Sequence, residues 1–145
     1  MVYLAAVAPQ AGEKPFAKLG KADEEAYFKG VAFDEKAGLM KIANKKAFIQ
    51  TFTSCKKCDG LEGFATMSVD EPALPGDGIS GPTKGLLSKL AKVYIYTQKD
   101  QIITLASQKN IAKGIKVQKT LSINTGHVPM VTNPELLAKT LKQVL

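Results

Sequence analysis

The sequence predicts an α/β fold of about three parallel strands with flanking helices, and three observations support this prediction. The β-branched and aromatic run Val93–Thr97 fits a buried strand, and Val117–Ile123 is a second short apolar-rich run, interrupted by Gln118 and Lys119. Between them, Leu105–Lys113 has a helical pattern that Gly114 ends, so the three segments form a βαβ crossover with parallel strands. The apolar run Val2–Val7 is expected to be a further strand, buried on both faces.

An acid and the only histidine follow the two later strands. Asp100 lies in the turn after Val93–Thr97, and His127 comes three turn residues after Ile123. Ligands and catalytic groups collect at the carboxyl ends of strands in an open α/β sheet. An aspartate there can fix the tautomer of a neighbouring imidazole, whose other nitrogen then acts as a base. Taken singly, Asp100 is equally well read as a turn former and His127 as a loop residue.

Residues of about 10–82 are expected to form an insertion between two strands of a single domain, 1–145. The helices expected in it are Ala22–Lys29, Lys36–Thr53 and Cys58–Ser68. An irregular Pro- and Gly-rich loop follows, and a short helix is expected over Thr83–Ala91. The final helix is better defined, because Asn133 is a good N-cap and Pro134 suits the first helical position.

All six phenylalanines fall in the expected insertion. A small helical subdomain needs an aromatic core, and most of the six are expected to serve that purpose. The alternative is that a few of them line an apolar pocket beneath the insertion.

The runs YIYTQKDQII and GHVPMVTNPELLAKTL, with the helix and strand between them, resemble the C-terminal part of the α/β-hydrolase superfamily. The most similar branch contains plant methylesterases, hydroxynitrile lyases and their bacterial relatives. There a T-x-x-D segment supplies the acid of a catalytic triad and a downstream histidine supplies the base. The resemblance therefore implies that Asp100 is the acid and His127 the base. It also implies that the insertion is a cap over a substrate pocket, for which we name Phe48, Phe52, Phe64 and Val128.

The start of the chain, VYLAAVAPQAGEKP, is similar to the strand and loop after the nucleophile helix of the same branch, so the resemblance covers nearly all 145 residues. It is specific at both ends and loose in the middle. The G-x-S-x-G elbow that carries the serine of this superfamily is missing, and Gly78–Gly81 has the wrong spacing. We therefore expect a fragment whose nucleophile segment lies upstream. Its strand Val2–Val7 would self-associate or pair with the N-terminal half.

The charge and composition of the chain exclude some classes of binding partner. The net charge is +7, but all twenty basic residues are lysines, and arginine is the residue that makes bidentate phosphate and guanine contacts. We therefore expect no nucleic-acid partner. No segment approaches the roughly 20 apolar residues of a membrane span, so no membrane partner and a cytoplasmic location are expected. No cofactor or metal is expected either.

Cys55 and Cys58 form the only C-x-x-C motif. With a single distant histidine they cannot supply the four ligands of a structural zinc site. A redox motif of the thioredoxin type would follow a first strand, whereas this motif follows an expected helix. The sequence therefore favours two ordinary cytosolic thiols at the start of a helix.

The function expected from these observations is hydrolysis of a carboxylic ester or related apolar acyl compound by a Ser-Asp-His triad whose serine is absent from the chain. Two alternatives stay open. One is a hydroxynitrile lyase-like enzyme that uses the same residues, and the other is a non-catalytic fragment that serves as a binding or assembly piece.

Overall fold

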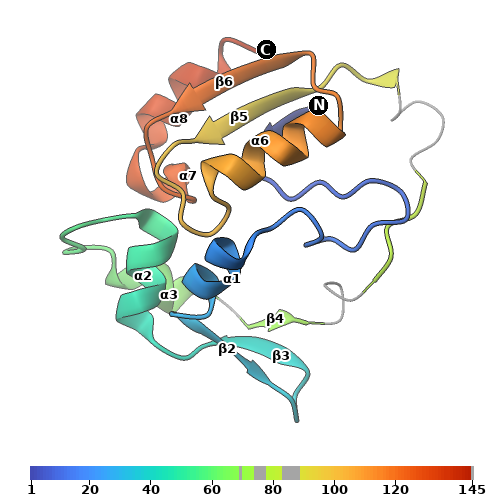
Figure 1. Ribbon diagram of the computed structural model, residues 1–145. Helices are drawn as coiled ribbons and strands as arrows, with labels where there is room; N and C mark the ends of the chain where they lie inside the picture. The colour runs from blue at the N-terminus through green and yellow to red at the C-terminus, as the bar shows by residue number, and fades with distance from the viewer. Residues whose placement is uncertain (69, 74–77, 83–88, 145) are drawn as a thin grey trace.

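The computed structural model describes residues 1–68, 70–73, 78–82 and 89–144, which fold into two sheets with helices around them (Figure 1). The first sheet is parallel and has the order β1-β5-β6, with β1 at Val2–Leu4, β5 at Val93–Thr97 and β6 at Lys119–Ile123. The second is antiparallel and has the order β2-β3-β4, with β2 at Val31–Asp34, β3 at Leu39–Ile42 and β4 at Glu71–Pro72. The helices are α1 (Lys21–Tyr27), α2 (Lys45–Thr53), α3 (Glu62–Met67), α6 (Leu105–Gly114), α7 (Pro129–Thr132) and α8 (Pro134–Leu141).

The central strand β5 is covered on both faces. Neighbouring side chains of a strand point to opposite faces, and here Tyr94 packs with Ile111 of α6 while Ile95 packs with Leu137 of α8. All four side chains are buried, and Tyr94 and Ile95 are fully so. The predicted α/β architecture, with its crossover from β5 through α6 to β6, is confirmed.

The last helix forms as the sequence predicts. The side-chain oxygen of Asn133 accepts a hydrogen bond from the backbone N–H of Leu136 at 3.1 Å, and Pro134 occupies the first helical position. The helix packs against β6 and so fixes the chain that follows the His127 loop.

Three sequence-based boundaries are wrong. The first strand ends at Leu4 rather than Val7, because Ala5 has a φ of 43° and turns the chain out of the sheet. A continuous helix over Lys36–Thr53 does not form, because Gly38, with a φ of 66°, closes a turn that pairs β2 with β3. The third expected helix, Cys58–Ser68, begins only at Glu62. The helix expected over Thr83–Ala91 lies largely outside the described residues.

The second sheet and helices α1 to α3 share a core of their own. Val31, Phe48, Ile49 and Ala65 are its buried residues, and Phe52 and Phe64 pack against them. Figure 1 shows this unit beside the carboxyl ends of β5 and β6, where α2 contacts α7. The sequence did not predict the small antiparallel sheet, because its strands are only two to four residues long.

Candidate active site

The loops that follow β5 and β6 are joined by their backbones. The N–H of Gln98 donates to the carbonyl of Ile123, and the N–H of Lys99 donates to the carbonyl of Thr125, each at 2.9 Å. These bonds continue the parallel ladder past the end of β5. They bring the residue before Asp100 next to a residue two positions before His127.

The Asp100 carboxylate is enclosed and well supplied with donors. Its side chain is fully buried. Oδ1 accepts hydrogen bonds from the backbone N–H groups of Ile102 and Ile103 at 2.8 and 2.9 Å, and Oδ2 accepts one from the Thr97 hydroxyl at 2.9 Å. A buried carboxylate is tolerated only when such partners replace its hydration.

His127 completes the set. Its Nδ1 lies 2.8 Å from Oδ2 of Asp100, and since a carboxylate only accepts, Nδ1 carries the hydrogen in this pair. The imidazole is 23% exposed, in contrast to the buried acid. The structure therefore brings together the two residues that the sequence singles out. Of the two side chains, that of His127 is partly exposed to solvent and that of Asp100 is buried.

Two contacts with α2 hold the His127 loop. A Cβ built on Gly126 would lie 2.4 Å from the carbonyl oxygen of Thr53, so only glycine allows this approach of the loop to the end of α2. The ring of Phe52 meets the His127 ring edge to face, with the centroids 5.7 Å apart. Helix α2 therefore contacts both the glycine before His127 and the His127 ring.

A cavity of about 230 Å³ opens beside His127, on the side of the insertion. The four residues that the sequence reading named for a pocket, Phe48, Phe52, Phe64 and Val128, all line it. It also contains residues that the sequence reading did not select, namely Tyr27, Val31, Met40, Lys41, Ile42, Ser68 and Glu71. Most of these come from β2, β3 and β4, so they were missed together with that sheet.

The lining is largely aromatic. Phe48 and Phe52 have ring centroids 4.2 Å apart, and Phe48 and Phe64 have centroids 5.2 Å apart. Burial raises the pKa of the Tyr27 phenol, so this side chain stays neutral at physiological pH. The Lys41 ammonium in the wall is engaged with the Asp34 carboxylate at 2.8 Å. The cavity is therefore suited to an apolar ligand.

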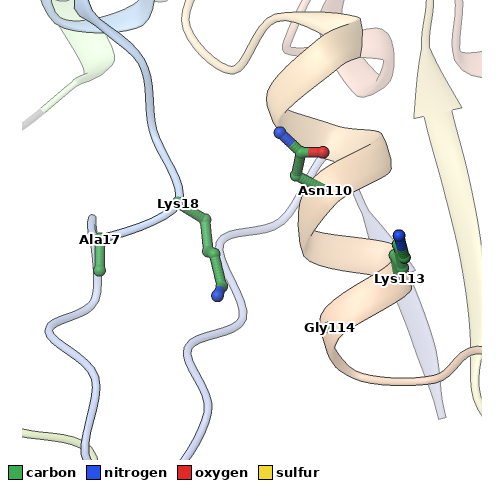
Figure 2. Close-up of a pocket in the computed structure, with 5 residues that line it drawn as sticks. All are labelled: Ala17, Lys18, Asn110, Lys113 and Gly114. Atoms are coloured by element: carbon green, nitrogen blue, oxygen red, sulfur yellow. The ribbon is translucent and has the colours of Figure 1, made fainter.

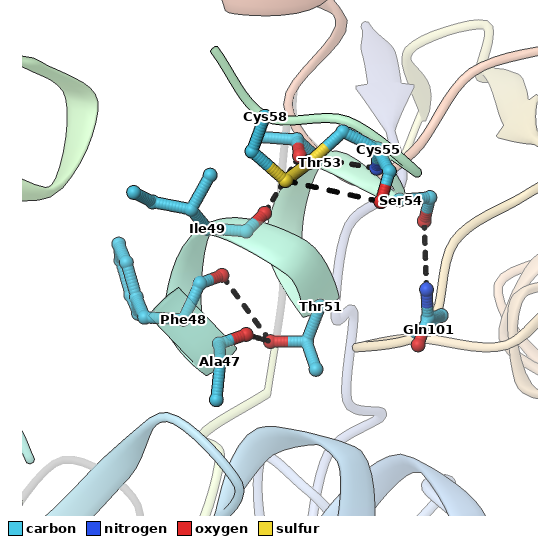
Figure 3. The surroundings of a disulfide bond; sticks show 9 residues. All are labelled: Ala47, Phe48, Ile49, Thr51, Thr53, Ser54, Cys55, Cys58 and Gln101. Carbon is cyan, nitrogen blue, oxygen red and sulfur yellow. Dashed lines mark hydrogen bonds between the residues drawn. A yellow bond between two sulfur atoms is a disulfide. The ribbon is translucent and has the colours of Figure 1, made fainter. Parts of the chain in front are cut away.

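The segment after α2 contains a disulfide between Cys55 and Cys58 (Figure 3). This corrects the expectation of two free thiols at a helix start. Ser54 precedes the disulfide in a left-handed conformation with a φ of 56°. Its hydroxyl donates to the carbonyl of Lys99 and accepts a hydrogen bond from Gln101 at 3.4 Å. The same turn therefore touches the loop that carries Asp100.

A second hollow, of about 490 Å³, lies between the segment at Ala17 and Lys18 and the end of α6 (Figure 2). Its other lining residues are Asn110, Lys113 and Gly114. It is open and has no acid–base pair, and Lys18 is paired with Glu13 at 2.7 Å. We therefore place the candidate site at the smaller cavity beside His127.

Ser80, in the only sequence run that imitates a nucleophile elbow, is held elsewhere. Its N–H donates to the carbonyl of Glu13 at 2.9 Å, and its carbonyl accepts from Gly12 at 2.8 Å. It lies in a loop without helix or strand, and not in the strand-to-helix turn that exposes a catalytic serine.

Across residues 1–68, 70–73, 78–82 and 89–144, no three His, Cys, Asp or Glu side chains gather as metal ligands would. None of the helices in these ranges is long and apolar enough to cross a membrane.

No protein-family model and no curated protein matches the sequence, whereas solved structures match the fold. The chain is similar to an extracellular α/β-hydrolase from a Paenibacillus species, with 17% identity, a TM-score of 0.79, and coverage of 98% of this chain and 60% of that one. It is also similar to a pyrethroid hydrolase from Sphingobium faniae, with 17% identity, a TM-score of 0.73, and coverage of 98% and 58%.

A third similar structure is polyneuridine aldehyde esterase, with 16% identity, a TM-score of 0.74, and coverage of 99% of this chain and 60% of that one. The chain thus spans less than two thirds of the length of each of these enzymes. At sequence identities this low, the structural similarity shows a shared fold alone. The three-stranded parallel sheet with its flanking helices matches part of the α/β-hydrolase fold.

Proposed function

We propose that Asp100 and His127 are the acid and the base of a hydrolytic triad, and that the complete protein hydrolyses a carboxylic ester or a related acyl compound. The observation that carries this proposal is the 2.8 Å contact between His127 Nδ1 and Asp100 Oδ2 at the mouth of an apolar cavity. The fold adds support, because the carboxyl edge of the sheet is where α/β-hydrolases place these two groups.

In this proposal each residue has a distinct role. Asp100 accepts the Nδ1–H and so keeps Nε2 bare, ready to take the proton of an attacking hydroxyl. When His127 becomes charged, the buried carboxylate stabilises the imidazolium. His127 then returns the proton to the leaving alcohol. The donors around Asp100 are fixed by the β5–α6 loop, so little reorganisation is needed during the reaction.

The substrate we propose is a small apolar ester, without a nucleic-acid or membrane partner. A cavity of about 230 Å³ lined by Phe48, Phe52, Phe64 and Val128 would take its hydrophobic part. The reacting carbonyl would lie at the His127 end. We further propose that the serine and the oxyanion donors come from a segment outside this chain, since the similar hydrolases are longer.

The test uses short p-nitrophenyl esters and two proteins. The 145-residue chain is expected to hydrolyse them no faster than its Asp100→Ala, His127→Ala double variant, because its sequence contains no G-x-S-x-G elbow to position a nucleophile. The chain produced with the upstream part of its reading frame, including a G-x-S-x-G sequence, is expected to be active. Activity of the short chain that the double variant loses would contradict the assignment of an outside nucleophile.

A lyase that cleaves cyanohydrins could use the same pair, and the same protein should be assayed with mandelonitrile. If the longer protein released neither cyanide nor p-nitrophenol while binding apolar esters, a non-catalytic binding role would replace both enzyme assignments.

A further inference from the structure

Gln108 of α6 is fully buried and has an unusual set of partners for a helix side chain. Its Oε1 accepts from the backbone N–H of Thr97 at 3.0 Å. Its Nε2 lies 3.0 Å from the carbonyl oxygen of Thr97 and 2.7 Å from that of Ile103. One side-chain amide therefore joins the last residue of β5 to the loop after Asp100.

The amide takes the place of a missing strand residue. Ala5 donates to the carbonyl of Ile95 and then leaves the sheet, so β1 offers nothing to Thr97, two residues further along β5. In a parallel ladder the N–H and C=O of Thr97 face the same side as the carbonyl of Ile95. Gln108 bonds both groups, as a neighbouring peptide would. Without it, two buried backbone groups would lack partners, at a cost of about 1–3 kcal/mol each.

Gln108 also acts on the Thr97 hydroxyl. Its Nε2 is 3.1 Å from Thr97 Oγ1, and that oxygen is 2.9 Å from Asp100 Oδ2. Because a carboxylate only accepts, the Thr97 hydroxyl donates its hydrogen to Oδ2, and the nearby Nε2 of Gln108, an amide nitrogen that cannot accept, favours that orientation of the hydroxyl. Hydrogen bonds arranged in such a chain strengthen one another. Oδ2 of Asp100 thus receives the Thr97 hydroxyl, a longer contact of 3.5 Å from Gln108 Nε2, and Nδ1 of His127.

We propose that Gln108 is a positioning residue for the acid–base pair: it locks the end of β5 and the Thr97 hydroxyl so that Asp100 holds His127 as the Nδ1–H tautomer. This rests on the proposed function, in which that tautomer is the working form. Gln108 touches neither the imidazole nor the cavity lining, so its effect passes through Thr97 and Asp100.

The single histidine makes the tautomer measurable. In the 145-residue chain labelled with ¹⁵N-histidine, the ring nitrogen shifts at alkaline pH report which nitrogen carries the hydrogen. Gln108→Met keeps the size of the side chain but removes its hydrogen bonds. We expect it to move His127 from the Nδ1–H form toward the Nε2–H form that a histidine side chain free in water favours. Amide exchange at Ile102 and Ile103 should rise by about tenfold or more, as loss of a buried hydrogen bond implies.

Two further variants guard against a Gln108→Met chain that does not fold. Thr97→Val removes only the hydroxyl and should shift the tautomer in the same direction, and Thr97→Ser should restore the wild-type signal. Thr140→Val is the control, because Thr140 is also a buried threonine, but its hydroxyl donates to the carbonyl of Leu136 within α8. It should lower stability without changing the tautomer.

The outcomes separate the two proposals. If wild-type His127 is not the Nδ1–H tautomer, the acid–base pairing of the proposed function is wrong. If the wild type has that tautomer and folded Gln108→Met and Thr97→Val chains keep it, with Ile102 and Ile103 still protected, the positioning role of Gln108 is overturned.

Discussion

Gly126 and Thr53 touch at a point where no side chain fits: a Cβ on Gly126 would lie 2.4 Å from the carbonyl oxygen of Thr53 and 2.5 Å from its carbonyl carbon. This contact joins the loop before His127 to the last residue of α2. Substitutions in α2 are therefore expected to alter the position of His127.

Gly126→Ala is expected to push the His127 loop away from α2 and to destabilise the chain by about 1–3 kcal/mol, the range for overpacking a buried contact. Thermal unfolding measures the loss. Gly63→Ala is the matched control, since a Cβ there meets nothing within 4 Å and Gly63 lies in α3. Equal stability of the Gly126→Ala chain and the wild type would show that the loop does not pack against α2 in this way.

The Asp23 carboxyl is expected to make the free energy of unfolding depend on pH in the acidic range. Burial acts to raise its pKa, but hydrogen bonds from Ser107, Thr104 and Gly20 outweigh burial and hold the pKa of the carboxyl below its ordinary value of 3.8. A carboxyl with a depressed pKa in the folded state stabilises above its unfolded pKa, and the contribution is lost as the pH falls through the folded pKa.

We therefore expect the wild type to lose stability relative to Asp23→Asn as the pH falls below about 4, so that the difference between their urea midpoints narrows. Glu24→Gln, at the exposed neighbouring position, is the control and should leave the wild-type pH profile unchanged. A constant difference between wild type and Asp23→Asn from pH 6 to pH 2.5 would contradict the assignment.

The disulfide should stabilise the turn that touches the Asp100 loop. A bridge that closes so short a loop is worth on the order of 2 kcal/mol in chain-entropy terms. Reduction with a dithiol is expected to lower the melting temperature and to speed amide exchange around Ser54, with a Cys55→Ser, Cys58→Ser chain as the control that ignores the reductant. The same melting curve with and without reductant, for a protein that thiol titration shows to be oxidised, would exclude this role.

The state of this pair in cells also tests the expected cytoplasmic location, because cytosolic thiols are usually kept reduced. Trapping with a thiol reagent at the moment of lysis distinguishes the two forms. A fully oxidised pair would favour an oxidising compartment.

The edge strand β1 is expected to pair with a strand of another molecule. It is at one end of the order β1-β5-β6, its residue Val2 is 38% exposed, and an unprotected edge strand templates pairing. We expect the 145-residue chain to self-associate at micromolar concentration by light scattering, and Val2→Pro, which removes an N–H that faces away from β5, to weaken association. A stable monomer in which hydrogen exchange of the Val2–Leu4 backbone amides is slow throughout would refute this expectation.

In the longer protein proposed above, His127→Ala should be far more damaging to turnover than Asp100→Asn. In the proposed triad the histidine takes and returns the proton, whereas the aspartate orients and stabilises it, and loss of a triad member costs about 10⁴ to 10⁶ in turnover. The measurement is kcat on a p-nitrophenyl ester, with Thr140→Val as a folding control. If His127→Ala kept activity within a few-fold of the wild type, the triad assignment would fall.

The sequence by itself determined the elements whose signals are local. The β-branched run at Val93–Thr97, the cap at Asn133 and the helix between β5 and β6 are set by side-chain shape and backbone hydrogen bonding within a few residues. The parallel crossover follows from them. Because parallel strands end at one edge, the sequence also predicted that Asp100 and His127 would lie close together.

Only the tertiary structure decided the contacts between distant segments. The turn at Gly38 and the pairing of β2 with β3 overrode the helical pattern of Lys36–Thr53, since strands this short are stabilised by packing rather than by propensity. The cavity wall and the contact of Gly126 with Thr53 depend on where α2 meets the loops that follow β5 and β6. The role of Gln108 arises in the same way, because an interior glutamine is informative only once the unpaired end of β5 is known.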